Sequence, residues 1–126
     1  HYHYQSISQY LERLNRYTKI QARELISSGY RFSWPDIIKK PMGEFLSRFF
    51  AGEGYKDGLH GLVLALLQAF SELTKYLKVW EKEKFVDQDI TNYHEYFEDN
   101  INDYLHWQEK SSSLIRKIRL KIKKKI

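Results

Sequence analysis

The fold of this chain is decided by the stretch Leu62-Val63-Leu64-Ala65-Leu66-Leu67, in the middle of a helical segment from Leu59 to Trp80. Because the stretch is apolar all the way round, the helix is expected to be buried, to form a re-entrant segment or to lie in a membrane interface. Polar residues flank the stretch, so it falls short of the about 20 apolar residues that span a bilayer. Two placements stay open, a core helix and a helix inserted in the membrane interface.

A glycine-rich turn precedes this helix: Ala51-Gly52-Glu53-Gly54-Tyr55-Lys56-Asp57-Gly58. Its three glycines can take positive φ, which predicts a sharp connector. The segment before the turn, Met42 to Phe50, carries an apolar face made of Phe45, Leu46, Phe49 and Phe50. The sequence therefore predicts two apolar helices joined by a tight turn.

The first of these two helices has a marked start and a marked interruption. Ser33-Trp34-Pro35-Asp36 favours a helix start, because proline suits the first turn and an acidic side chain suits the positive end of the helix dipole. Pro41 disfavours helical geometry at Lys40 and removes a hydrogen-bond donor. We therefore expect a kink or a restart of the helix before Met42.

An earlier segment, Ser6 to Ser28, has apolar residues mostly at steps of three and four, which is typical of an amphipathic helix. Ser6 or Ser8 can cap it, and Gly29 can end it. The apolar set is Ile7, Tyr10, Leu11, Leu14, Tyr17, Ile20 and Leu25. Since strand-like alternation is absent from the sequence, the predicted fold class is all-α.

The net charge of +5 over 126 residues divides into three unequal blocks. Residues 1–80 carry 11 basic and 7 acidic side chains (net +4), residues 81–110 carry 3 and 9 (net −6), and residues 111–126 carry 7 basic and no acidic side chains (net +7). The chain lacks cysteine, which excludes disulfides and thiolate metal sites. It begins with His1 and has its only methionine at Met42, so we expect the natural start to precede it.

The acidic block predicts a further amphipathic helix over residues 87–107, with Asp87 or Asp89 as its cap. Its apolar set is Ile90, Tyr93, Phe97, Ile101 and Tyr104. The three serines at 111–113 are expected to weaken or break the helix. The basic segment after them is a solvated helix end, a membrane anchor or a nucleic-acid binder. Nucleic acid is the least favoured partner, because the segment lacks the aromatic residues that stack bases.

No active site follows from the residues alone. The five histidines show no zinc-ligand spacing, and the chain has no phosphate-binding glycine motif and no nucleophile motif.

A family resemblance is carried by the block from Pro41 to Leu62. In this block Phe45-Leu46 is followed by Gly54-Tyr55-Lys56-Asp57-Gly58 and Gly61-Leu62, and the pattern resembles the C-terminal part of bacterial family-2 glycosyltransferases that build lipopolysaccharide and other surface glycans. Lys75-Tyr76-Leu77-Lys78-Val79-Trp80-Glu81 is similar to the end of that region. Upstream, His3-Tyr4, Asn15-Arg16-Tyr17-Thr18 and Gln21-Ala22 look like the helix that follows the catalytic core.

The resemblance implies that residues 1–81 are the helical C-terminal appendage of a GT-A-type enzyme, followed by an acidic amphipathic helix (82–110) and a basic amphipathic tail (111–126). Such an enzyme transfers a sugar from a nucleotide-sugar donor to a lipid-linked or glycan acceptor with the help of a divalent metal, Mg²⁺ or Mn²⁺. Its catalytic domain would lie upstream of His1, so no catalytic residue is expected in this chain. The implied location is peripheral, at the cytoplasmic face of the bacterial inner membrane.

The resemblance also assigns residues to two regions. The residues near the donor or metal would be His3, Arg16 and Tyr17. The membrane and acceptor region would contain Phe45, Arg48, Phe49, Phe50, Tyr55, Asp57, Gly58, Gly61, Lys75, Lys78 and Trp80. Six basic residues are expected to surround that region and to meet anionic lipid: Lys39, Lys40, Arg48, Lys56, Lys75 and Lys78. The alternative is a non-enzymatic amphipathic helical module that binds membranes or partner helices.

Overall fold

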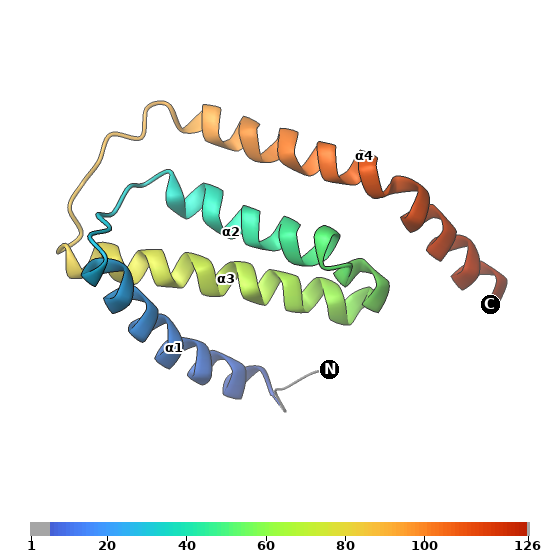
Figure 1. The fold of residues 1–126 in the computed structure, drawn as a ribbon, viewed down its shortest axis with the longest axis horizontal. Helices are drawn as coiled ribbons and strands as arrows, with labels where there is room; N and C mark the ends of the chain where they lie inside the picture. The colour runs from blue at the N-terminus through green and yellow to red at the C-terminus, as the bar shows by residue number, and fades with distance from the viewer. Residues whose placement is uncertain (1–5, 126) are drawn as a thin grey trace.

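A computed structural model describes residues 6–125, and the side chains of residues 6–111, as an assembly of helices (Figure 1). The helices are α1 (Ile7–Ser27), α2 (Asp36–Leu46), α3 (Gly58–Lys82) and α4 (Tyr93–Lys125). Two short turns of helix join α2 to α3, the π-helical η1 (Ser47–Ala51) and the 3₁₀-helical η2 (Gly54–Asp57). The described residues contain no strand, which confirms the all-α prediction.

The helices form one layer in the order α1, α3, α2, α4 (Figure 1). Helices α2 and α3 are an antiparallel hairpin, α1 packs on α3, and α4 runs along the other side of α2. The C-terminal part of α4 extends past the hairpin tip, a name we use for residues 47–58. Since α2 and α3 have neighbours on both sides, they form the centre of the molecule.

Helix α1 begins and ends as its sequence predicts. The Ser6 side chain accepts a hydrogen bond from the Gln9 backbone N–H at 3.1 Å, which caps the first turn. The buried side of the helix consists of Leu14, Thr18 and Ala22. Gly29 follows the last turn with a φ of 95°, a left-handed conformation that favours glycine.

Helix α2 starts at Asp36, as predicted, but runs without a break through Pro41 to Leu46. The predicted restart is therefore wrong. A proline inside a helix loses one backbone hydrogen bond, here the one that would reach the Ile37 carbonyl group. Packing of α2 between α3 and α4 outweighs this loss.

The hairpin tip is tighter than an ordinary loop, because helical turns occupy most of it. Gly58 takes a φ of 62°, and Glu53 adopts a left-handed conformation with a φ of 59°. Gly61 lies against the backbone of the tip, so that a Cβ atom at this position would sit only 1.8 Å from the Gly54 carbonyl oxygen. The glycines at 58 and 61 thus permit the sharp reversal from α2 to α3.

The connection from α3 to α4 is an extended segment that lies against the α1–α2 loop. The Phe32 N–H donates to Glu83 Oε2 at 2.7 Å, and the Trp34 N–H donates to Gln88 Oε1 at 2.8 Å. The Gln88 amide in turn donates to the Phe32 carbonyl oxygen at 2.9 Å. These bonds tie two loops that are about fifty residues apart in the sequence and fix where α4 begins.

Two predictions for the last third of the chain are wrong. Helix α4 begins at Tyr93 rather than at residue 87, because the Asp89 side chain accepts from the Thr91 N–H in a local turn and caps no helix. The helix then continues through the three serines to Lys125, so the acidic and basic segments belong to one helix of 33 residues. Ser111 is buried, and serine at such a site does not stop a helix that is already formed on both sides.

The core consists of two clusters at opposite ends of the α2–α3 hairpin. One cluster lies at the end of the hairpin beside the α1–α2 loop, which we call the loop end. It contains the buried residues Ala22 from α1, Phe32 from the α1–α2 loop and Val79 from α3. At the hairpin tip, the cluster contains the buried residues Leu46, Phe50 and Tyr55, packed against Met42, Phe45, Phe49 and Trp107.

Candidate functional site

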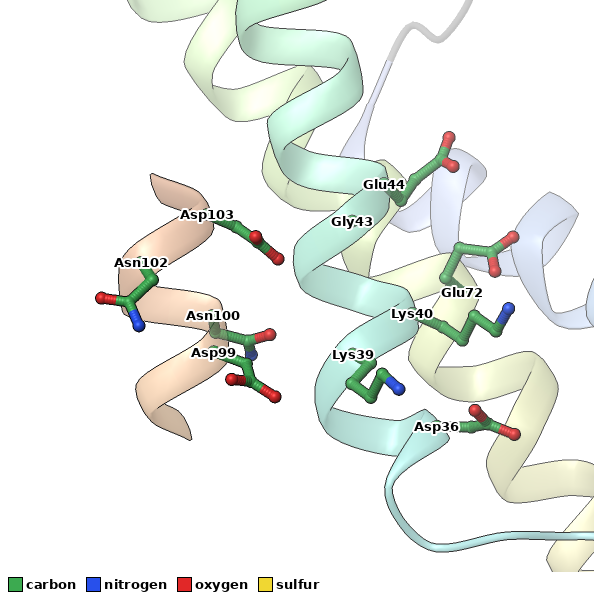
Figure 2. Close-up of a pocket in the computed structure, with 10 residues that line it drawn as sticks. All are labelled: Asp36, Lys39, Lys40, Gly43, Glu44, Glu72, Asp99, Asn100, Asn102 and Asp103. Atoms are coloured by element: carbon green, nitrogen blue, oxygen red, sulfur yellow. The ribbon is translucent and has the colours of Figure 1, made fainter. Parts of the chain in front are cut away.

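One side of the helical layer carries a polar groove of about 640 Å³ between α2 and α4 (Figure 2). Asp99, Asn100 and Asp103 project from α4 toward α2 in this groove. The complete lining is Asp36, Lys39, Lys40, Gly43, Glu44, Glu72, Asp99, Asn100, Asn102 and Asp103. It contains five acidic and two basic side chains, so the groove has a net negative charge.

The polar groups of the groove serve the packing of α4 on α2. Asn100 is buried, and its Nδ2 donates to the Ile38 carbonyl oxygen at 3.0 Å. The Lys39 ammonium lies 5.7 Å from the centre of the Tyr96 ring, a cation–π contact between the two helices. Within the described part of the chain, no group of three His, Asp or Glu residues is close enough together to hold a metal ion.

The opposite side of the layer carries exposed apolar residues. Glu72 lines the groove from one face of α3. By the 3.6-residue period of the helix, the opposite face of α3 holds Leu59, Leu66 and Phe70. On α2 the same period separates Lys40 and Gly43 from Phe45, which stacks on Phe49 of η1. We call Leu59, Leu66, Phe70, Phe45 and Phe49 the apolar face.

Large apolar side chains are exposed on the apolar face, as they also are on α1 and α4. Leu59 is 72% exposed, Leu66 53% and Phe70 47%, whereas Phe45 and Phe49 are partly buried against the cluster of the hairpin tip and their rings stack at 5.4 Å. Contiguous apolar surfaces of this kind mark contacts with a protein or a membrane. No described helix has the length and the apolar character needed to cross a membrane.

The structure brings four of the five predicted aromatic residues of the membrane and acceptor region, all but Trp80, together at the hairpin tip. Phe49 lies 5.1 Å from Phe50 and 6.2 Å from Tyr55, measured between ring centres. Phe50 also stacks on Trp107 of α4 at 6.2 Å. Phe50 and Tyr55 are buried, whereas Phe45 and Phe49 are partly exposed.

The other predicted residues of the tip have backbone or surface roles. Gly58 and Gly61 permit the tight turn described above, and Asp57 is exposed at the start of α3. The Arg48 Nε atom pairs with Glu44 Oε1 at 2.7 Å on the surface of α2. Lys56 pairs with Glu53 at 2.7 Å, and its hydrogen bond to this carboxylate raises the pKa of Lys56.

Three predicted residues of the region lie away from the tip. Lys75 pairs with Glu72 at 2.9 Å, and Lys78 donates to the backbone and side-chain oxygens of Asn15 on α1, both at 2.6 Å. Burial lowers the pKa of Lys78. Trp80 donates to the Val86 carbonyl oxygen at 2.7 Å at the loop end.

The basic residues therefore do not ring the apolar face as a group. Lys39 and Lys40 line the polar groove, and Lys75 and Lys78 lie on the side of α3 near α1. Only Arg48 and Lys56 remain near the hairpin tip, each paired with a carboxylate.

The residues assigned to the donor or metal are not joined into a site. Arg16 and Tyr17 are exposed on α1, and the buried side of that helix is formed by other residues. His3 lies outside the described residues. Neither Arg16 nor Tyr17 lines the polar groove between α2 and α4.

One partly buried polar pair was not predicted from the sequence. The Tyr30 hydroxyl donates to Asp36 Oδ2 at the start of α2, beside an edge-to-face contact with Tyr76 at 5.5 Å. Burial, together with the hydrogen bond to Asp36, raises the pKa of Tyr30 far above its ordinary value. Burial also raises the pKa of Tyr76. The pair fastens the α1–α2 loop to both hairpin helices and has no catalytic geometry.

The spacing of apolar residues in the sequence contains a signal from which the exposed side of α3 could have been predicted. Leu59, Leu66 and Phe70 recur at steps of seven and four on a helix whose buried side holds the small residues Gly61 and Ala65. The stretch from Leu62 to Leu67, which is apolar on all sides, therefore contributes residues both to the buried side of α3 and to its exposed side.

No family model matches this chain, and no curated protein and no solved structure matches it either. The resemblance to glycosyltransferases rests on the sequence patterns quoted above.

Proposed function

We propose that this chain is the C-terminal helical segment of a bacterial family-2 glycosyltransferase and that it holds the enzyme against the cytoplasmic surface of the inner membrane. The observation that carries the membrane contact is the apolar face on α2 and α3, opposite the polar groove. The sequence pattern around the hairpin tip supports the family. An enzyme that modifies a lipid-linked acceptor needs its active site at the level of the lipid headgroups.

The apolar face supports reversible membrane binding. Fully burying a large aliphatic or aromatic side chain is worth roughly 1.5–3 kcal/mol, and the side chains of this face are already partly covered in the folded chain. Insertion of the face is therefore comparable to a single acyl anchor rather than to a spanning helix. The net charge of +4 over residues 1–80 adds attraction to anionic lipid.

Donor binding and metal chemistry belong, in this proposal, to residues upstream of His1. The nucleotide-sugar donor and Mg²⁺ or Mn²⁺ would be held there, and the segment described here would position the acceptor at the membrane surface. The hairpin tip is the part of the segment best placed for that role, because its aromatic cluster adjoins the apolar face.

Vesicle sedimentation tests the membrane contact. The chain is expected to sediment with vesicles of anionic phospholipid and much less with neutral vesicles. Replacing both Leu66 and Phe70 with Ser should reduce the bound fraction by about tenfold, because two exposed apolar groups leave the interface. Replacing Tyr17 and Ile20 with Ser removes two similarly exposed apolar groups from α1 and should leave binding unchanged.

Circular dichroism of both double variants controls for folding. Equal losses in the two variants, or no loss in either, would contradict a membrane role for the apolar face.

The enzyme half of the proposal has a separate test. The coding sequence upstream of His1 should extend the reading frame by a strand-rich domain with an Asp-x-Asp motif, and the longer protein should consume a nucleotide sugar in the presence of Mg²⁺ or Mn²⁺. A stop codon or a start codon directly before His1 would contradict this half and leave the membrane contact to be judged on its own.

A further inference from the structure

Helix α4 carries a second apolar surface, which we call the α4 stripe. Tyr93, Phe97, Ile101 and Tyr104 follow one another at helical steps and are each 43% to 56% exposed. The helix packs on the rest of the chain mainly through other residues: Tyr96 and Asn100 contact Lys39 and Ile38 of α2. Near the hairpin tip, Trp107 stacks on Phe50 of η1, whose ring Tyr104 also contacts at 6.2 Å. Tyr93, Phe97 and Ile101 therefore lie on a side of α4 that α2 leaves exposed, and Tyr104 lies at the edge of the contact with the hairpin tip.

The spacing of the α4 stripe continues into the basic segment. From Phe97 onward, steps of four and three residues lead through Ile101 and Tyr104, then through the polar residues Gln108 and Ser111, of which Ser111 is buried within the chain, to isoleucines at 115, 118 and 122. The backbone stays helical over this whole range. Alternating steps of four and three residues over several heptads are typical of a coiled coil.

The charges along α4 determine the orientation of a second helix. Residues 93–110 carry five acidic side chains and one basic side chain, a net charge of −4, whereas residues 111–125 carry seven basic side chains and a net charge of +7. A parallel copy would place like charges together, and an antiparallel copy places each acidic half beside a basic half. We infer that two copies of this chain associate through α4 as an antiparallel coiled coil.

One register pairs three of the four residues of the stripe with isoleucines of the basic segment and places Gln108 level with the partner's Ser111. It places Phe97 level with the partner's Ile122, Ile101 level with the partner's Ile118, and Tyr104 level with the partner's Ile115. The two-fold symmetry repeats each of these layers at the other end of the pair. In the same register, Glu98 and the partner's Arg119 lie at positions that flank the apolar contact between the two helices. Charges at such positions select the relative orientation of the helices.

The length and position of α4 suit this partner. A helix of 33 residues is about 50 Å long, and its basic end extends past the hairpin tip, where a second molecule can reach it (Figure 1). An anionic membrane would attract the basic half but repel the acidic half. A second copy complements both halves, and the contact uses α4, whereas the proposed membrane contact uses α2 and α3.

A charge swap tests the pairing in the full chain by sedimentation equilibrium. The unaltered chain is expected to form a dimer. Glu98→Lys alone and Arg119→Glu alone should each raise the dimer dissociation constant by about tenfold or more, since two symmetric attractions become repulsions. The double variant restores opposite charges and should restore the affinity.

Glu98 is exposed and is not among the residues that pack on α2, so its replacement leaves that contact intact. Glu95→Lys makes the same charge change at another exposed site of α4 and, combined with Arg119→Glu, should give no rescue. A chain that stays monomeric, or a charge swap without rescue, would overturn the inference. Vesicle binding that Arg119→Glu weakens without any effect on self-association would assign the basic half to lipid and would also overturn it.

Discussion

Helices α3 and α4 both carry large apolar residues, but they use them in opposite ways. Helix α3 buries Gly61, Ala65 and Val79 against its neighbours and exposes Leu66 and Phe70 on the far side. Helix α4 contacts α2 through Asn100 and Tyr96 and the hairpin tip through Trp107, and it exposes most of its aliphatic and aromatic stripe.

The difference shows that the apolar side of a helix is not always its packing side. Small residues allow α3 to approach the hairpin tip and α1 closely, so its larger side chains are left to face outward. On α4 the contact with α2 is partly polar and borders the acidic groove. In both helices the exposed apolar residues are available for another surface, which we propose is a bilayer for α3 and a second copy of α4 for α4.

The largest expected effect comes from the closest approach on α3. Gly61→Ala places a Cβ atom where the Gly54 carbonyl oxygen now lies, so the backbone of the hairpin tip must move. We expect the free energy of unfolding in urea to fall by about 3 kcal/mol or more. Gly43→Ala on α2 meets no atom within 4 Å and should instead raise it by about 0.5–1 kcal/mol, because alanine favours helix. Similar values for the two variants would contradict the close packing at Gly61.

Helices α3 and α4 can be compared directly by replacing one apolar side chain on each with alanine and measuring the free energy of unfolding. Val79 is completely buried, so Val79→Ala should lower the free energy of unfolding by about 2 kcal/mol. Leu105 on α4 is half-exposed and lies outside the α4 stripe, so Leu105→Ala should change it by no more than about 0.5 kcal/mol. If both truncations cost the same in urea denaturation, the contrast between the helices is wrong.

The smallest effect concerns the loop that fastens the hairpin helices. Loss of the Tyr30–Asp36 hydrogen bond in Tyr30→Phe should cost about 1–2 kcal/mol at pH 7. Because burial raises the pKa of Tyr30, the unfolded chain loses this proton first as the pH rises above about 10. Stability of the unaltered protein should therefore fall in that range.

Urea denaturation at several pH values measures this dependence. Tyr30→Phe should show a weaker decline above about pH 10, with a remainder from Tyr76, whose pKa is also raised. Tyr17→Phe, at an exposed site, should leave stability at pH 7 unchanged. An identical alkaline decline in Tyr30→Phe would show that Tyr30 does not contribute to it.

The sequence predicts where the helices lie along the chain better than it predicts which side of each helix packs against the rest of the molecule. The bounds of α1 and α3 follow from caps, glycines and periodicity, which are local. The course of α2 through Pro41 and of α4 through the three serines depends on packing and on the neighbouring turns, which no local signal records.

The candidate site divides in the same way. The aromatic cluster of the hairpin tip follows from residues that are close in the sequence. The polar groove and the separation of Lys75 and Lys78 from the tip depend on how α4 and α1 pack on the hairpin, and this packing includes Asn100 and Trp107, which the sequence does not mark.

The central claim, that the apolar face of α2 and α3 rests in the membrane interface, is tested most directly by a spin label at a single site. Because the chain has no cysteine, Leu66→Cys on the apolar face and Asn102→Cys in the polar groove each give one unique label. On anionic vesicles, power-saturation electron paramagnetic resonance should show the label at 66 accessible to oxygen and shielded from a water-soluble nickel complex. The label at 102 should show the reverse. Equal access of the nickel complex to both labels on vesicle-bound protein would contradict the account.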